Sequence, residues 1–206
     1  MDFDFTVTWF EQLARANWDD LLTQISPSHL LEIGSYEGAS ACYLIEKLGA
    51  RGPLEIVCVD TWEGGVEHQE AATDMASVEA RFDHNIALAR AAVTHPVQLL
   101  KLKGRSDHWL AQLLADGKRG HFDFIYIDGS HQAPDVLCDA VLAFHLLKVD
   151  GVMIFDDYLW SEHPPQQLDP LRCPKPAIDA FVNLHARKIA ILRAPLYQLF
   201  LRKVAD

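Results

Sequence analysis

The sequence predicts an α/β protein built on a doubly wound, mostly parallel sheet. Short apolar runs of strand length alternate with segments of helical spacing about five times along the chain. The alternation closes on two successive strand-like runs, which predicts an antiparallel last strand. At 206 residues and 50% hydrophobic content, the chain has the size and the apolar material for one domain with a sizeable core.

Seven apolar runs predict the strands of this sheet. They are His29–Ile33, Leu54–Val59, Val97–Leu102, Phe122–Ile127, Val152–Phe155, Ile189–Leu192 and Tyr197–Val204. Most of them are bounded by glycine, proline or an acidic residue, and the continuous apolar runs among them are typical of strands covered by helices on both faces.

Helical spacing of apolar residues predicts the helices between the strands. The segments are Trp9–Gln24, Ala39–Leu48, Met75–Val93, Ser106–Ala115, one between Phe122–Ile127 and Val152–Phe155, and Ala177–Arg187. Pro27 ends the first segment, which we expect to form one or two helices. Ser106 is a natural N-cap for its helix. Thr61–Thr73 and Leu159–Pro174 are expected to be loops.

The composition excludes several functional classes. A net charge of -11 leaves no basic face for nucleic acid. An acidic N-terminus and the lack of an apolar run of about 20 residues predict a soluble, cytoplasmic protein without a membrane partner. The four cysteines lack paired-ligand spacing, and Cys42, Cys58 and Cys138 fall in apolar patterns. We therefore expect buried thiols in a reducing compartment rather than a zinc site.

We expect residues 1–28 to form an N-terminal helical segment that packs on the core, and residues 29–206 to form the single domain. A homodimer through apolar positions of the N-terminal helices stays open at this point. The partner expected in either case is a small molecule.

Three acidic residues follow the two central strands. Asp128 comes directly after Phe122–Ile127, and Asp156 and Asp157 come directly after Val152–Phe155. A strand, a crossover helix and a parallel strand place both strand ends on the same edge of a sheet, and neighbouring strands lie about 5 Å apart. We therefore expect the three carboxylates to converge at the edge where open α/β sheets bind their ligands.

A glycine turn is expected after the first strand, between Gly34 and Gly38. Its pattern is G-x-x-x-G, and Tyr36 and Ala39 stand where a dinucleotide fingerprint has glycine, which disfavours a nicotinamide or flavin cofactor. Asp60 ends the second strand about 20 residues later, where an acid can hydrogen-bond ribose hydroxyls. The turn and Asp60 together predict a ligand that has a ribose and little need for phosphate contacts.

With these features the chain resembles the class I S-adenosylmethionine-dependent methyltransferases, which have a Rossmann-like fold. More narrowly, it is similar to the branch that includes macrocin-type and other sugar O-methyltransferases and the cephalosporin-hydroxylase-like proteins. The matching motifs are LEIGSYEG (31–38), VDTWEG (59–64), FDHNI (82–86), GRS (104–106), IDGSH (127–131) and FDDY (155–158). IDGSH followed by FDDY is the specific part, whereas Leu159–Pro174 has its own composition, so the substrate does not transfer.

The resemblance implies roles for individual residues. The cofactor-binding residues that it implies are Glu32, Gly34, Ser35, Gly38, Asp60, Thr61, Trp62, Ser106 and Asp128. Within this set, Glu32 and the glycines would cradle the methionine part, Asp60 would bind the ribose hydroxyls, and Ser106 would approach the adenine. The implied metal ligands are Asp128, Asp156 and Asp157. The implied catalytic residues are Asp128 and His131, with His131 as the general base.

This chemistry is consistent with the residue types. Three carboxylates at one sheet edge repel one another unless a cation lies among them, and magnesium prefers oxygen ligands. A bound cation can lower the pKa of a substrate hydroxyl, and His131, with an unperturbed pKa of about 6.5, can accept the proton. We therefore predict a magnesium-dependent O-methyltransferase that uses S-adenosylmethionine and acts on a small hydroxylated molecule, a sugar or a natural-product scaffold.

Two alternatives stay open. In the first, the acids position the substrate of a metal-independent methyltransferase. In the second, the fold serves a non-catalytic cofactor-binding or interaction protein, and the acids and His131 are ordinary turn and cap residues. His68 and His163 are further candidates near the same edge, whereas His84 is expected to be structural.

Overall fold

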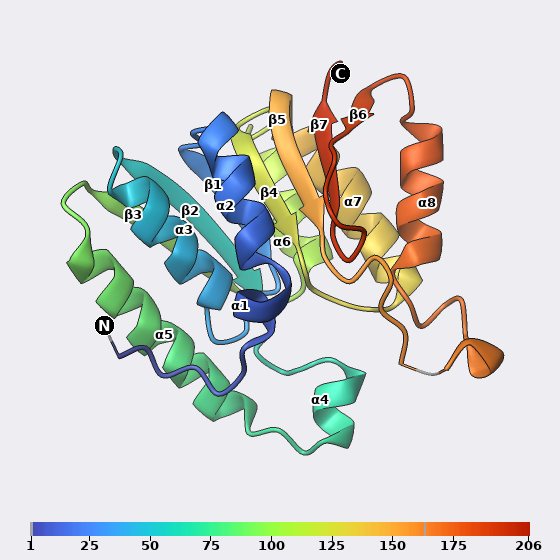
Figure 1. Cartoon of the computed structure of the whole chain (residues 1–206), viewed down its shortest axis with the longest axis horizontal. Coiled ribbons are helices and arrows are strands. Elements are labelled where there is room, and N and C mark those ends of the chain that lie inside the picture. The colour runs from blue at the N-terminus through green and yellow to red at the C-terminus, as the bar shows by residue number, and fades with distance from the viewer. Residues whose placement is uncertain (1, 163) are drawn as a thin grey trace. The chain divides into compact units, whose positions relative to one another are not determined.

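Each apolar run that predicts a strand is a strand in the computed structural model, which describes residues 2–162 and 164–206 (Figure 1). The chain divides into two units, Met1–Gly104 and Arg105–Asp206. The strands belong to a mixed, mostly parallel seven-stranded sheet whose last strand is antiparallel to its neighbours. The prediction of a doubly wound, Rossmann-like α/β fold is therefore confirmed.

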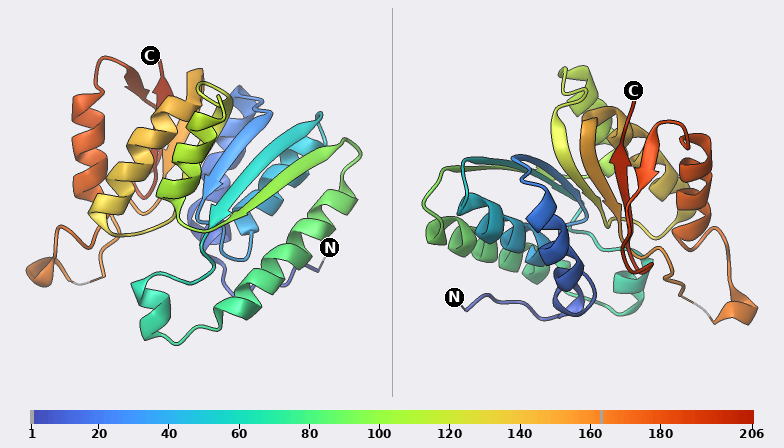
Figure 2. Two further views of the ribbon diagram at one scale, coloured as in Figure 1. Left: turned by 180° about the vertical axis from the view of Figure 1, so that it is seen from behind. Right: turned by 45° about the horizontal axis from the view of Figure 1, so that its top comes forward.

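The first unit is built on three parallel strands. Across the sheet they run β3 (Val97–Lys103), β2 (Leu54–Asp60) and β1 (His29–Ile33). Its helices are α1 (Trp9–Leu13), α2 (Arg15–Gln24), α3 (Ala39–Gly49), α4 (Val66–Glu70) and α5 (Met75–Ala92). The central residues of β2 are buried, as expected of a strand with neighbours on both sides. Within this unit, α3 lies beside α5 and against β2 (Figure 2).

The N-terminal helices of this unit pack through aromatic side chains. Trp18 of α2 is buried, and its ring lies 5.0 Å from that of Phe10 and 6.1 Å from that of Tyr43 on α3. Asp19 accepts a hydrogen bond from the Tyr43 hydroxyl at 3.0 Å and pairs with Lys47 at 2.6 Å. The helical segment is thus held on α3 by an apolar contact and a polar one. Its predicted division from the rest of the chain at residue 28 stays a prediction.

The second unit has one parallel strand pair and two antiparallel pairs. β4 (Phe122–Ile127) pairs with β5 (Leu147–Phe155), β5 pairs with β7 (Leu199–Lys203), and β7 pairs with β6 (Ile189–Ile191). The helices are α6 (Ser106–Ala115), α7 (Ala133–Leu146) and α8 (Lys175–Leu184), with the 3₁₀ turn η1 at Pro165–Gln167. α7 lies between α6 and α8 and packs on β4 and β5 (Figure 2).

Strand β5 starts five residues earlier than its apolar core predicts. Phe122 pairs with Leu147, but Phe124 pairs with Val152, so the register shifts between the two pairs. The extra residues include Asp150 with φ 68° and the buried Gly151. Because this irregular stretch contains polar residues, a prediction from apolar runs does not detect where the strand begins.

Three local predictions are wrong. Thr61–Thr73 contains the one-turn helix α4, which is too short to show helical periodicity. Ser106 is the first residue of α6, and Arg105, in extended conformation, takes the N-cap position without a side-chain cap. Cys138 is exposed because it lies off the stripe of buried residues on α7 that includes Val136, Ala140 and Ala143. Cys42 and Cys58 are buried as predicted.

No helix among the described residues is long and apolar enough to cross a membrane. The predicted location in the cytoplasm stays a prediction.

The irregular stretch of β5 gives a stability prediction. A Cβ at Gly151 would lie 2.7 Å from Leu147 Cδ1 and 2.9 Å from the Lys148 carbonyl oxygen, so Gly151→Ala forces the backbone to shift. We expect it to lower the free energy of unfolding by about 1–3 kcal/mol, measured by urea denaturation. Gly52→Ala is the matched control, because a Cβ there meets nothing within 4 Å. Equal effects at both positions would contradict the described packing of β5.

Candidate active site

The turn between β1 and α3 depends on two glycines. Gly34 and Gly38 have φ values of 84° and 82°, in the left-handed region that glycine adopts without strain. The Gly34 N–H donates to the Val59 carbonyl oxygen at 2.8 Å, which joins the ends of β1 and β2. A Cβ at Gly38 would lie 3.0 Å from the Phe82 ring, so α5 leaves no room for a side chain there.

Asp60, the last residue of β2, holds this turn. Its Oδ2 accepts hydrogen bonds from the backbone N–H groups of Ser35 at 2.8 Å and Tyr36 at 2.9 Å. Its Oδ1 accepts one from the Trp62 N–H at 2.7 Å. Because a carboxylate oxygen has two lone pairs, these bonds fill Oδ2 and leave an acceptor position on Oδ1 for a ligand hydroxyl.

Trp62 is buried and hydrogen-bonds the backbone of the turn. It is 3% exposed, has a φ of 48°, and donates from Nε1 to the Tyr36 carbonyl oxygen at 3.0 Å. Its ring lies 4.9 Å from that of Phe82, and Lys101 Nζ lies 4.5 Å from its ring centroid. Thr61 Oγ1 accepts the Glu63 N–H at 3.1 Å. Trp62 therefore supports the turn from within the unit.

Glu32 lies beneath the turn with 1% exposure. Its two carboxylate oxygens accept the hydroxyls of Ser35 and Ser40, each at 2.5 Å. Burial raises the pKa of Glu32 to about 7, although these hydrogen bonds oppose the shift. Glu32 is thus engaged with the protein on both oxygens, and it fixes the Ser35 side chain within the turn.

In the second unit, the ends of β4 and β5 bring Asp128 and Asp156 to one tyrosine. The Tyr126 hydroxyl donates to Asp128 Oδ2 at 3.0 Å and also contacts Asp156 Oδ2. Asp156 Oδ1 accepts the Asp157 N–H at 2.8 Å. Burial and the two neighbouring carboxylates raise the pKa of Tyr126 well above its usual value, so this phenol stays protonated and remains a donor.

Asp157 binds the predicted base. Its Oδ2 lies 2.8 Å from His131 Nε2, and its Oδ1 accepts the Tyr197 hydroxyl at 2.7 Å. The Trp160 ring lies 4.1 Å from the His131 imidazole, and the Trp160 N–H donates to the Asp157 carbonyl oxygen at 2.9 Å. The imidazole is therefore held by a hydrogen-bond partner at its edge and by an indole on its face.

Two of the three predicted metal ligands, Asp128 and Asp157, lie in one group of potential ligand atoms. One potential ligand atom from each of Asp128, His131 and Asp157 lies within 4.8 Å of the other two. This group contains His131, predicted as the base, and does not include Asp156, whose oxygens contact Tyr126 and the Asp157 N–H. Asp128, His131, Asp156 and Asp157 all line one small pocket of the unit.

Ser106 is the first residue of α6. It interacts with the buried Asp139 of α7, and burial raises the pKa of Asp139 to about 7.

Among the other candidate histidines, His68 contacts the Tyr36 ring at 5.2 Å between ring centroids, and His84 is exposed on α5. His163 lies outside the described residues.

Sequence reasoning missed the two phenols of the acid cluster. Tyr126 precedes Asp128 by two residues in strand-like sequence. Because side chains two residues apart in a strand lie on the same face, the sequence does indicate that these two can meet. Tyr197 reaches Asp157 from a segment 40 residues later in the chain, just before β7, and no local pattern indicates that contact.

The family model described as a methyltransferase domain matches residues 31–158. The chain belongs to this methyltransferase family. The class I S-adenosylmethionine-dependent methyltransferase predicted from the motifs is therefore confirmed, and the protein is a methyltransferase enzyme. No curated protein matches the chain.

Solved O-methyltransferases share the fold of this methyltransferase at low sequence identity. TomG of Streptomyces achromogenes, involved in tomaymycin synthesis and solved with SAM, is 19% identical with a TM-score of 0.60, over 93% of this chain and 80% of that one. An O-methyltransferase of Bacillus cereus solved with SAH is 20% identical with a TM-score of 0.61, over 98% and 84%. MycE of the mycinamycin pathway, solved with Mg, SAH and mycinamycin VI, is 16% identical with a TM-score of 0.59, over 98% and 51%.

Glu32 gives a prediction on the pH dependence of stability. Its pKa is about 7 in the folded protein against an ordinary value of 4.5, so between these pH values the folded state holds a proton that the unfolded state has lost. The free energy of unfolding therefore falls as pH rises from 4.5 to about 7 and then levels off, a loss on the order of 3 kcal/mol. Glu32→Gln should remove this part of the pH dependence.

The measurement is urea denaturation of wild type and Glu32→Gln at several pH values. Asp20→Asn is the control, because it removes one carboxylate at an exposed position of α2. Identical slopes for wild type and Glu32→Gln across this window would show that Glu32 is ionised in the folded protein.

Proposed function

We propose that this methyltransferase transfers the methyl group of S-adenosylmethionine to a hydroxyl of a small molecule, a sugar or a natural-product scaffold, with the help of magnesium. The observation that carries this proposal is the grouping of Asp128, His131 and Asp157, whose ligand atoms lie within 4.8 Å of one another. Two carboxylates beside a histidine combine a site for a hard cation with a base for a hydroxyl proton.

The glycine turn fits the cofactor. Gly34 and Gly38 allow the left-handed backbone of the turn, and Asp60 Oδ1 has an acceptor position for a ribose hydroxyl. We keep Ser35, Thr61, Ser106, Glu32, Trp62 and Asp128 in the proposed cofactor set. Within it, Glu32 and Trp62 hold the turn in shape, since the side chains of both are buried. The cofactor would supply the methyl group on its sulfonium.

The acid cluster fits magnesium. Asp128, Asp156 and Asp157, at the ends of two paired strands, would supply hard oxygen ligands. Burial and the negative charge of Asp157 raise the pKa of Asp156 to about 6, and a cation beside these carboxylates would offset this repulsion. Magnesium would supply positive charge that lowers the pKa of an acceptor hydroxyl.

His131 is the proposed general base. When Nε2 carries the proton shared with Asp157, Nδ1 is the proton acceptor of the neutral ring. After His131 takes the hydroxyl proton, the Asp157 carboxylate stabilises the imidazolium that results. Tyr197 holds Asp157 at 2.7 Å, and Trp160 keeps the imidazole plane in place, so the base is positioned before the acceptor arrives.

A metal-independent methyltransferase is the second candidate. It is favoured by the two phenols, because the Tyr126 hydroxyl lies between Asp128 and Asp156 and the Tyr197 hydroxyl donates to Asp157, and these contacts compensate part of the carboxylate charge. In that case the acids would position the acceptor through hydrogen bonds, and His131 would keep its role as base.

The test is calorimetric titration with S-adenosylmethionine and S-adenosylhomocysteine, each with magnesium and with EDTA. We expect micromolar binding of both, and heat from magnesium alone that disappears in Asp157→Asn. Asp20→Asn is the matched control, because Asp20 is exposed on α2. Cofactor binding without any magnesium heat would favour the metal-independent enzyme, and no binding of either cofactor would contradict the proposal.

His131→Ala separates a base from a metal ligand. A base acts only on the acceptor proton, so the variant should bind magnesium as wild type does and lose turnover by about 100-fold or more. Loss of magnesium heat in the same variant would instead make His131 the third ligand. His84→Ala, on the exposed face of α5, is the control for the loss of a histidine.

A further inference from the structure

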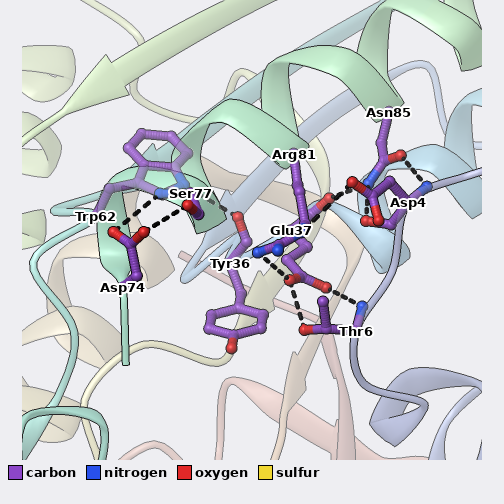
Figure 3. Close-up of polar contacts among 9 residues, drawn as sticks. All are labelled: Asp4, Thr6, Tyr36, Glu37, Trp62, Asp74, Ser77, Arg81 and Asn85. Atoms are coloured by element: carbon purple, nitrogen blue, oxygen red, sulfur yellow. Dashed lines mark hydrogen bonds and ion pairs between the residues drawn. The ribbon is translucent and has the colours of Figure 1, made fainter. Parts of the chain in front are cut away.

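Residues 2–8 of the N-terminus, here called the N-terminal strap, are held by two buried polar side chains. Glu37 is 1% exposed and Asn85 is 0% exposed, and both point toward the strap (Figure 3). Glu37 Oε2 accepts the Thr6 N–H and Oε1 accepts the Thr6 hydroxyl, each at 2.7 Å. Asn85 accepts the Asp4 N–H at 2.8 Å and donates to the Asp4 carbonyl oxygen at 3.2 Å.

These contacts fix the register of the strap. A buried carboxylate is costly unless its oxygens are satisfied, and Thr6 satisfies both of them while Arg81 adds a contact at 3.4 Å. Asn85 also donates to the Glu37 carbonyl oxygen at 3.1 Å, and Arg81 Nε lies 3.5 Å from Asp4 Oδ2. A shift of the strap by one residue would break the bonds of Thr6 and Asp4 together.

The register places one indole beside the glycine turn. Trp9 follows the strap directly, and its ring lies 5.4 Å from that of Tyr36 and 6.3 Å from that of His68, with 5.2 Å between Tyr36 and His68. The backbone of Tyr36 is held by hydrogen bonds of its N–H to Asp60 and of its carbonyl oxygen to Trp62. Trp9 nevertheless remains 55% exposed. These three rings, the aromatic trio, lie in mutual contact, and the Trp9 ring leaves part of this cluster open to solvent.

We infer that the aromatic trio binds the ring of the methyl acceptor and that Glu37 is a positioning residue that holds Trp9 in place for it. The inference rests on the proposed function, because it assigns the shape of the acceptor of that reaction. A fixed, half-exposed indole gains most from a ligand with a flat apolar face. An aromatic ring with hydroxyls and the carbon–hydrogen face of a sugar ring both have this chemistry.

The experiment measures ring contact and cofactor binding separately. The probes are 3,4-dihydroxybenzoate and methyl α-rhamnopyranoside, each added to the protein saturated with S-adenosylhomocysteine. Saturation-transfer NMR reports protein contact with the ring protons of each probe, and calorimetry gives the Kd of the cofactor. The probe that gives the stronger signal tells which kind of ring the trio accepts.

We expect Trp9→Ala to reduce ring-proton saturation at least about fivefold and to leave the cofactor Kd within about twofold. Trp9→Phe keeps a ring and should retain most of the signal. Glu37→Gln should lose the signal as Trp9→Ala does and should also speed amide exchange in residues 2–8. Thr6→Ser keeps both donors to Glu37 and should behave as wild type, whereas Thr6→Val removes the hydroxyl and provides a second test if Glu37→Gln does not fold.

Three outcomes would overturn the inference. They are no ring saturation with either probe, equal signals in wild type and Trp9→Ala, and a rise in the cofactor Kd of Glu37→Gln as large as its loss of ring signal. A wild-type protein that does not bind S-adenosylhomocysteine fails the proposed function instead, and calorimetry detects this before any probe is added.

Discussion

The carboxylate of Asp60 is the constraint on which the first unit depends. It accepts three backbone N–H groups, from Ser35, Tyr36 and Trp62, and so ties the end of β2 to the turn that follows β1. Tyr36 and Trp62 have φ values of 47° and 48°, and such left-handed conformations persist only where the surroundings determine them. The hydrogen bonds to the charged Asp60 carboxylate hold Tyr36 and Trp62 in this conformation.

The acids of the second unit are stabilised in a different way. Their main partners are phenol hydroxyls, Tyr126 between Asp128 and Asp156 and Tyr197 on Asp157, and one backbone N–H, that of Asp157, donates to Asp156. The pKa values of both tyrosines are raised by burial and by these carboxylates, so each phenol remains a donor. A preorganised set of donors keeps several negative charges close together before any ligand binds.

The sequence predicted the features that depend on local pattern. The strands could be predicted because their apolar runs are continuous. The glycine turn and Asp60 could be predicted from the number of residues that separates them in the sequence. The start of β5 was not, because polar residues form its irregular end, and α4 was not, because five residues carry no periodicity. The contacts of Glu37 with Thr6 and of Tyr197 with Asp157 join segments 31 and 40 residues apart, which no short motif encodes.

The attachment of the N-terminal strap has a consequence for the order in which the chain can fold. Asp4 is bonded to Asn85, which lies 81 residues later, so this part of the chain leaves the ribosome long before its partner is made. At synthesis rates of about 5–20 residues per second, it waits for several seconds without that contact. Residues 2–8 are therefore synthesised before the partner that holds them and are among the last in their unit to reach their final place, and the surface that they complete exists only after α5 has formed.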